Sequence, residues 1–246
     1  MTTLFGNPVG RRGAPILCYH AVQNVPEPGR RAPFILPVAE FERQLDAILA
    51  DGWTFVSGHD FAASHLGGSR LPTRAVLLTF DDGFDDLEAT IAPLLAARQI
   101  PSVAFVVTQL LGQTNVWDAH LGAPPLRLLG IEGLRRIAQL GVDIAPHSRT
   151  HQRLTELDVV SVRQEVAGAK SDLLALGFPE SPFFAYPYGR FNKIVADVVR
   201  EAGIPLGLAT HRGGIIARFD RLRLPRIVVE RGHDPVALLD RRQKRV

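Results

Sequence analysis

The chain has 246 residues, of which 46% are hydrophobic and 22% charged. This composition supplies apolar material for a sizeable core, excludes disordered and collagen-like chains, and the length allows one domain or two small ones. The net charge of +3, from 28 Lys+Arg against 25 Asp+Glu, comes with only 7% aromatic residues, so we expect no nucleic-acid partner. No apolar run reaches the roughly 18 residues of a membrane-spanning helix.

The two ends and the single cysteine bear on where the protein works. Residues 1–13 include Arg11 and Arg12 but no apolar stretch before a small-residue cleavage site, so they do not predict a secretory signal. Cys18 is the only cysteine, which excludes an intramolecular disulfide. We therefore expect a cytoplasmic protein, with the inner membrane face as a place where it could work. Residues 1–13 and 241–246 are predicted tails, the basic one being a solvated end or a weak anchor to anionic lipid or a charged substrate.

Short apolar runs rich in β-forming residues alternate with segments of helical periodicity. In chain order they are the strand Ile16–His20, a helix through Phe41, Leu45, Ile48 and Leu49 that ends at Gly52, the strands Trp53–Val56 and Ala75–Phe80, the helix Leu87–Arg98, the strand Ser102–Val107, the helix Ile131–Leu140, the strand Val142–Ala145, the helix Leu157–Leu176, the strand Phe183–Tyr186, the helix Asn192–Ala202, the strands Leu206–Ala209 and Arg226–Val229, and the helix Pro235–Arg242. Such alternation predicts parallel strands in βαβ units. We expect one α/β domain over residues 1–246, for which a single (β/α) barrel fits better than a doubly wound sheet, although periodicity does not separate the two.

Two pairs of polar residues directly follow expected strands. Asp81 and Asp82 are adjacent carboxylates at the end of a buried strand, where they are costly unless something neutralises them. The alternative is an ordinary Asp-Gly turn. His147 and His151, four residues apart, can face the same way on a helical turn and share one metal. Such a pair also arises by chance, so it is weak on its own.

Two further features lie at expected strand ends. A turn at Tyr186-Pro187-Tyr188-Gly189 can expose backbone N–H groups that stabilise an oxyanion, or can simply cap a strand. His20 ends the first strand, either as a packed residue or as a catalyst. All four features fall on the rim where parallel barrels build their active sites, which makes them a strong joint signal. The irregular stretch Gln109–Gly130, with Trp117, is long for a loop and is therefore a candidate functional segment.

Three motifs together resemble a known family. Thr79-Phe80-Asp81-Asp82-Gly83, His147-x-x-x-His151 and Tyr186-Pro187-Tyr188-Gly189, in this order, look like those of the polysaccharide deacetylases of the NodB-homology group, carbohydrate esterase family 4. The likeness runs from about Ile16 to Val229. It implies a distorted (β/α)7 barrel.

The resemblance also implies roles for particular residues. Asp81 corresponds to the general base, and Asp82, His147 and His151 to the ligands of one divalent metal, by default zinc, although Co²⁺, Ni²⁺ or Fe²⁺ would suit the same donors. Tyr188 corresponds to the residue whose N–H holds the oxyanion. We expect Pro187, Gly189 and Trp117 to bind substrate.

The sequence departs from the family pattern at two places. Many members have an arginine that orients the base two positions before the motif proline, where this chain has Ala185. A late Leu-x-His that supplies the general acid is also missing, as in the branch that acts in exopolysaccharide synthesis, which carries an N-terminal Tyr-His instead. His20 is then the expected acid, with His211 as the second choice.

The implied function is a metal-dependent hydrolase that removes N-acetyl groups from an amino sugar in a polysaccharide, oligosaccharide or lipid-linked glycan. One alternative is a deformylase or other C–N amide hydrolase of the same fold acting on a small molecule. Metal-free relatives of that kind usually lack the histidine pair, so His147 and His151 favour a metal. The other alternative is a barrel that binds glycan without hydrolysis, which Ala185 favours. The sequence does not predict an oligomeric state.

Overall fold

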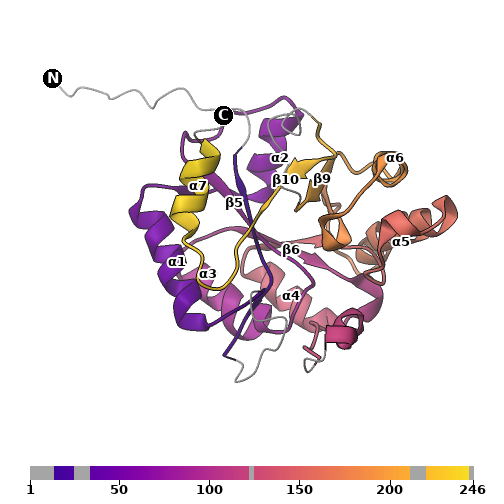
Figure 1. The fold of residues 1–246 in the computed structure, drawn as a ribbon, viewed down its shortest axis with the longest axis horizontal. Coiled ribbons are helices and arrows are strands. Elements are labelled where there is room, and N and C mark those ends of the chain that lie inside the picture. Colours follow the sequence, from indigo (N-terminus) through magenta and orange to yellow (C-terminus); the bar gives the residue numbers. More distant parts are fainter. Residues whose placement is uncertain (1–13, 25–33, 122–124, 211–219, 244–246) are drawn as a thin grey trace.

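The computed structural model describes residues 14–24, 34–121, 125–210 and 220–243 (Figure 1). The predicted tail 1–13 lies outside these ranges, as does His211.

Seven strand positions form the barrel. They are β1 (Ile16–Tyr19), β5 (Ala75–Phe80), β6 (Ser102–Val106), β7 (Val142–Pro146), β8 (Phe183–Ala185), β9 (Leu206–Ala209) and a last one shared by β10 (Leu224–Pro225) and β11 (Ile227–Val228). The strands pair in parallel, in the orders β11-β1-β5-β6-β7 and β10-β9-β8. Arg226 separates β10 from β11, so one segment pairs with β9 and then with β1. The sheet is interrupted between β7 and β8. This confirms the predicted α/β class and distorted (β/α)7 barrel.

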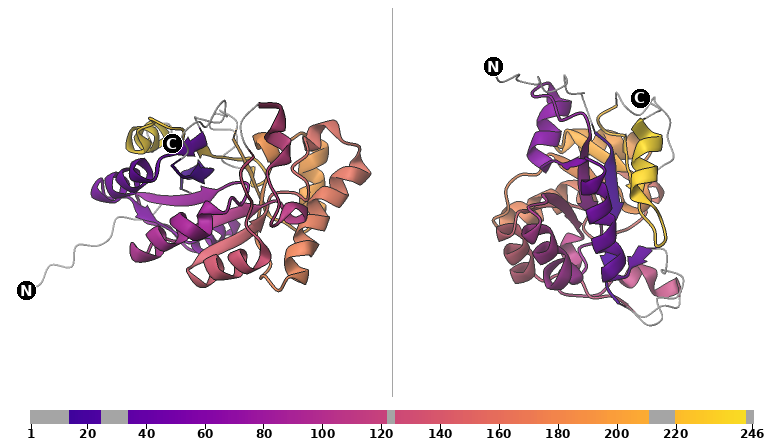
Figure 2. Two further views of the ribbon diagram at one scale, coloured as in Figure 1. Left: turned by 90° about the horizontal axis from the view of Figure 1, so that it is seen from below. Right: turned by 90° about the vertical axis from the view of Figure 1, so that its left-hand side faces the viewer.

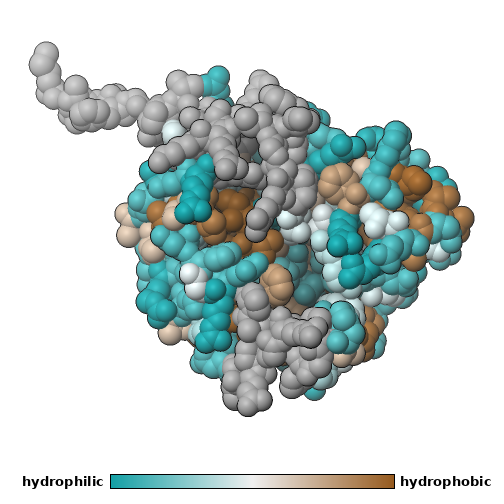
Figure 3. All heavy atoms as spheres, viewed as in Figure 1, coloured by the Kyte–Doolittle hydropathy of each residue, from teal (hydrophilic) through white to brown (hydrophobic). Residues whose placement is uncertain are grey.

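Helices surround this ring of strands (Figures 1 and 2). They are α1 (Val38–Ala50), α2 (Gly58–Leu66), α3 (Ala92–Ala97), α4 (Ile131–Gln139), α5 (Val159–Ala175), α6 (Lys193–Glu201) and α7 (Pro235–Gln243), with a π-helix at Leu87–Ile91 and short 3₁₀ turns at Thr108–Leu110, Val116–Leu121, Leu154–Glu156 and Pro187–Gly189. No helix in the described ranges is both long and apolar enough to cross a bilayer. Where the face in Figure 3 is coloured, hydrophilic residues predominate, and hydrophobic ones gather near the centre of the view and on the α5–α6 side.

Alternation along the strands divides the core into two layers. On β5, Ala75 and Leu77 pack inside the barrel with equivalent residues of the other strands, whereas Val76, Leu78 and Phe80 pack outwards against helices. Because successive side chains of a strand point to opposite faces, the inward series continues through Thr79 and then Asp81 of the loop that follows. The same alternation directs the polar residues at the carboxyl ends of several strands into one layer at the top of the barrel interior. These residues are Cys18, Asp81, His147 and Arg226.

Several elements differ from the expectation. Helix α2 was not predicted, although Ser57 caps it by accepting the Asp60 N–H (3.0 Å) and Gly67 ends it at φ 110°. The run expected at Trp53–Val56 yields only β4 (Thr54–Phe55), which pairs with the start of β5 and is not a barrel position. The expected helix over Leu87–Arg98 is divided into a π-helix and α3.

The short pair β2 (Ala21–Val22) and β3 (Ile35–Leu36) was also not expected. At the C-terminus, α7 runs to Gln243, so residues 241–243 belong to a helix and not to a tail.

Candidate active site

Three side chains from the ends of β5 and β7 meet in a buried group. The Nε2 atoms of His147 and His151 lie 3.5 Å and 3.3 Å from Oδ1 of Asp82. All three residues are buried, and one ligand atom from each lies within 4.8 Å of the others. Imidazole nitrogens with a carboxylate oxygen suit Zn²⁺ and other divalent transition metals, with positions left open for water or substrate. The donor set therefore fits the implied metal, and the structure brings the three predicted ligands together.

The neighbouring carbonyl of Ala185 fixes the orientation of His147. The Nδ1 atom of His147 lies 2.8 Å from the backbone oxygen of Ala185, which can only accept a hydrogen bond. The proton of a neutral His147 ring is thus held on Nδ1, and the lone pair of Nε2 faces Asp82. A hydrogen-bond acceptor at Nδ1 sets the imidazole tautomer that leaves Nε2 free to bind a metal.

Burial and neighbouring charges oppose one another in this group. Burial by itself raises the pKa of Asp82, but hydrogen bonds from His147 and His151 prevail and hold that pKa well below its usual value. Burial also disfavours the charged form of His147, yet the charges of Asp81 and Asp82 raise its pKa. At His151 burial dominates and lowers the pKa. Asp82 is therefore ionised at neutral pH, as a metal ligand must be.

The histidines do not share a helical turn, the arrangement that their spacing allowed. They belong to a loop in which Ser148 and His151 have left-handed backbones, with φ of 65° and 62°. The hydroxyl of Ser148 accepts the N–H of His151 at 3.0 Å. Asp82 is also left-handed, with φ of 73°. Local backbone reversals, not helical spacing, turn the ligands towards one point.

Asp81 is held by an arginine that sequence reasoning did not single out. Nη1 and Nη2 of Arg226 donate to the two carboxylate oxygens of Asp81, each at 2.6 Å. The Arg226 side chain has no exposed surface, and its guanidinium lies 5.4 Å from the centre of the Phe105 ring. A guanidinium therefore reaches the candidate base from the β10–β11 junction, although Ala185 stands where the family pattern has arginine. A charged residue inside an apolar strand was the available signal.

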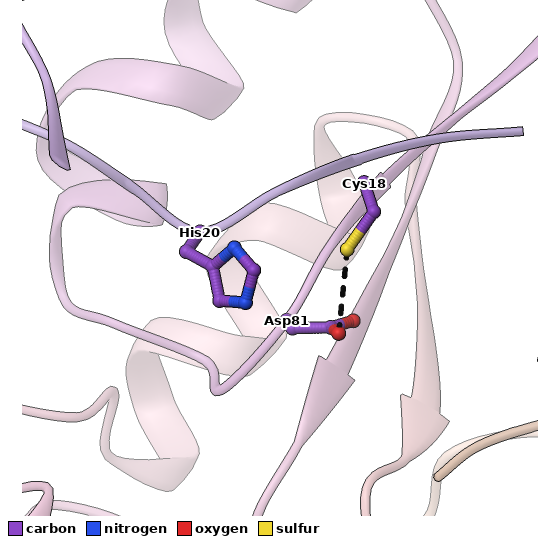
Figure 4. Close-up of side chains that lie close together, drawn as sticks. All are labelled: Cys18, His20 and Asp81. Atoms are coloured by element: carbon purple, nitrogen blue, oxygen red, sulfur yellow. Dashed lines mark hydrogen bonds between the residues drawn. The ribbon is translucent and has the colours of Figure 1, made fainter. Parts of the chain in front are cut away.

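The surroundings of Asp81, of which Figure 4 shows Cys18 and His20, keep it ionised. Burial raises its pKa, but the charge and hydrogen bonds of Arg226, together with the charge of His147, outweigh burial and lower the pKa below the ordinary value. The thiol of Cys18 lies 3.4 Å from Oδ2 of Asp81 as a hydrogen-bond donor. Burial raises the pKa of this thiol well above its usual value, so Cys18 stays neutral.

His20 lies at the rim beside Asp81 (Figure 4). Ligand atoms of Cys18, His20 and Asp81 fall within 4.8 Å of one another. A metal ion bound by these three residues is disfavoured, because the guanidinium of Arg226 already pairs with Asp81 and like charges repel in a site of low dielectric constant. The ring of Phe34 packs against His20 at 5.2 Å. The structure thus places His20 beside the candidate base, and its role as the general acid stays a prediction.

The turn after β8 contains Tyr188, whose N–H is predicted to hold the oxyanion. Tyr188 is left-handed, with φ of 58°, and the hydrogen bonds that close the turn are donated by Gly189 to Tyr186 (2.8 Å) and by Arg190 to Pro187 (3.1 Å). The Tyr188 N–H therefore stays outside the bonds of the turn itself. Gly189 is required here, because a Cβ atom would lie 1.7 Å from the hydroxyl oxygen of Thr210.

Trp117 packs against the group of Asp82, His147 and His151. Its ring stacks on His151 with 4.3 Å between centroids, and the Tyr188 ring lies 4.6 Å from the same imidazole. The guanidinium of Arg153 lies over the Tyr188 ring at 4.4 Å. Trp117 therefore packs on a predicted ligand, and its contact with substrate stays a prediction.

Comparisons with known proteins agree with this geometry. The family model described as polysaccharide deacetylase matches residues 68–207, more than half of the chain. The chain belongs to the polysaccharide deacetylase family.

A curated relative and two solved structures show how this family member compares with others. Poly-beta-1,6-N-acetyl-D-glucosamine N-deacetylase of Staphylococcus epidermidis is 26% identical over 77% of this chain and 66% of its own length. The chain thus spans about two thirds of that relative. The Streptococcus pyogenes deacetylase PplD in complex with acetate has a TM-score of 0.79 at 24% identity, over 92% of this chain and 96% of PplD. IcaB from Ammonifex degensii has a TM-score of 0.75 at 22% identity, over 89% and 93%. At these identities the structures show a common fold.

Another buried acid of this polysaccharide deacetylase family member, Asp86, anchors the segment after His20. Its Oδ2 accepts the backbone N–H of Val22 on β2. Burial is the main cause that raises the pKa of Asp86 to about 7, and the charge of Asp85 adds to it. An acid whose folded pKa exceeds its unfolded value binds more protons when folded, so its contribution to stability is lost as pH rises towards 7.

We therefore expect the unfolding free energy of the wild type to fall as the pH rises from 5 to 8, because of Asp86. Two pH units of differential protonation correspond to about 2–3 kcal/mol of unfolding free energy. Asp86→Asn removes this titrating group, and the urea unfolding free energy of the variant should fall less over the same pH range. The measurement is urea unfolding of both proteins at pH 5 and pH 8. Equal losses in both would contradict the assignment.

Proposed function

We propose that the chain catalyses metal-dependent hydrolysis of the N-acetyl group of an amino sugar in a glycan. The observation that carries the proposal is the buried Asp82–His147–His151 group, beside a carboxylate, Asp81, that is held ionised at the rim of the barrel. The Staphylococcus epidermidis relative is named for deacetylating poly-β-1,6-N-acetyl-D-glucosamine, so oligomers of that polymer are the first substrates to test.

Asp82, His147 and His151 would hold the metal, zinc by default. A divalent ion at such a site polarises an amide carbonyl and lowers the pKa of water. Asp81 takes a proton from the attacking water, and the water oxygen bonds to the acetyl carbon. The N–H of Tyr188 donates to the oxyanion, and His20 gives a proton to the nitrogen as the C–N bond breaks, which yields acetate and a free amine.

Arg226 bears on the non-catalytic alternative. That alternative depended on Ala185, because many family members have at this position an arginine that orients the base. The bidentate contact of Arg226 with Asp81 supplies a guanidinium from another strand. The loss at Ala185 therefore no longer argues against hydrolysis.

The proposal is tested by zinc content together with amine release. Wild type should bind one zinc ion and release amine from N-acetylglucosamine oligomers, and His147→Ala should lose both properties. Zinc bound in full by His147→Ala would contradict the ligand set. Release from N-formyl but not N-acetyl substrates would favour the deformylase alternative, and zinc binding without either reaction would favour a glycan-binding barrel.

His20 is proposed as the general acid, and His20→Ala is expected to lower kcat by about 10²-fold or more with fold and zinc content unchanged. It should also remove the alkaline limb of the pH–rate profile, because the acid form of His20 is needed. His211→Ala is the comparison, since this residue lies outside the described ranges and was the second choice. Loss of the limb in His211→Ala alone would transfer the role to His211.

A cytoplasmic location, free or at the inner membrane face, stays a prediction that rests on the single free Cys18. Cell fractionation checks it, and recovery of the protein outside the cytoplasm would contradict it.

A further inference from the structure

Helix α5 fastens the loop that carries both histidines through a carboxylate that the proposed reaction does not use. Oε2 of Glu165 accepts the backbone N–H groups of Arg149 (3.0 Å) and Thr150 (2.9 Å), and Oε1 accepts the Thr150 hydroxyl (2.7 Å). Glu165 is only 6% exposed. Arg149 and Thr150 are two of the three residues between His147 and His151. One buried side chain therefore binds the middle of the predicted metal-binding loop.

A second carboxylate on α5, that of Asp172, binds the side chain of Arg149 in the same loop. Asp172 is two helical turns after Glu165 and accepts Nε (2.9 Å) and Nη2 (3.1 Å) of Arg149. It also accepts the Thr108 hydroxyl at 2.7 Å. The backbone N–H of the same Thr108 donates to the carbonyl of Ser148 at 3.2 Å. The loop is thus fixed between α5 and the segment that follows β6.

The loop needs such support because its backbone is strained. Ser148 and His151 have left-handed φ values of 65° and 62°, and each such conformation of a residue other than glycine costs about 1–3 kcal/mol. It persists only where the surroundings impose it. A buried N–H group without an acceptor costs a further 1–3 kcal/mol, roughly. Glu165 removes the cost of the unpaired N–H groups only when the loop has the conformation in which these groups face its carboxylate.

We propose that Glu165 is a positioning residue for the metal centre. By binding the N–H groups of Arg149 and Thr150 it presets the loop so that His147 and His151 both face Asp82 before any ion arrives. The inference rests on the proposed function in so far as the Asp-His-His group binds a metal. Outer partners of metal ligands typically change metal affinity 10–100-fold. Glu165→Ala should therefore raise the zinc Kd by about 10–100-fold.

The test measures zinc binding, not turnover. Zinc Kd is determined by competition with a chromophoric chelator on the full chain, and circular dichroism gives the thermal midpoint of the same metal-free protein. Glu165→Gln should bind zinc nearly as well as wild type, because its amide oxygen can accept both N–H groups and the Thr150 hydroxyl can turn to accept from the amide. Gln164→Ala is the matched control, since Gln164 is the exposed neighbour on the same helix.

The outcomes separate positioning from general stability. Weaker zinc binding in folded Glu165→Ala, restored in Glu165→Gln and absent from Gln164→Ala, supports the proposal. A lower thermal midpoint with an unchanged zinc Kd overturns it. If Glu165→Ala does not fold, Glu165→Asp decides, because its carboxylate is one methylene short of the loop, and wild-type affinity there overturns the proposal. Failure of the wild type to bind zinc would refute the proposed function instead.

Discussion

Asp81→Asn is expected to lower kcat by about 10²–10⁴-fold, the range of a lost general base, while the protein keeps its zinc. An amide does not take a proton from water near neutral pH, whereas the ligand group of Asp82, His147 and His151 is left intact. The measurement is amine release from N-acetylglucosamine oligomers, with zinc content determined on the same sample.

Asp82→Asn is the matched control, because it makes the same chemical change one residue along. This variant should lose zinc and activity together. Asp81→Asn leaves the charge of Arg226 buried without its counter-ion, so activity must be compared well below the thermal midpoint of each protein. Should Asp81→Asn lose zinc while Asp82→Asn retains it, the base and the ligand must be exchanged.

The sequence was informative where one local pattern determines the structure. The runs at Ala75–Phe80 and Leu206–Ala209 are strands with the predicted bounds, because their length and apolar character suit a buried parallel strand. Parallel strands present their carboxyl ends on one side of a barrel, so Asp82, His147 and His151 could be expected to meet. This expectation needed only the order of strands and motifs.

Contacts between segments far apart in the chain could not be predicted from the sequence. Arg226 reaches Asp81 across 145 positions, and its partner could not be inferred from a strand pattern that identified only apolar neighbours. Glu165 looked like one acid among others on a helix, because its partners are the backbone N–H groups of another loop. The loop conformation at His151 also could not be read from spacing, since a left-handed residue other than glycine is imposed by its surroundings.

Arg226→Met is expected to destabilise the protein by about 3–5 kcal/mol and to lower kcat strongly at neutral pH. Methionine fills part of the space but leaves the Asp81 carboxylate buried and unpaired. Burial raises the pKa of Asp81, and the charge of Arg226 is the main cause that lowers it. Without that charge the pKa rises, so the acid limb of the kcat/KM profile should move to higher pH.

A double-mutant cycle separates this pair from general packing. If the unpaired carboxylate is the cost, Arg226→Met combined with Asp81→Asn should lose less stability than the sum of the two single variants, with a coupling of about 0.5–3 kcal/mol. Arg223→Met is the matched control, because Arg223 is 45% exposed and pairs with Asp220 at 2.9 Å, an interaction of about 0–1 kcal/mol. Urea unfolding of all four variants gives the free energies. Additive losses of unfolding free energy would mean that Arg226 does not hold Asp81. A loss in Arg226→Met as small as in Arg223→Met would mean the same, since a buried guanidinium that compensates a buried carboxylate cannot be removed without cost.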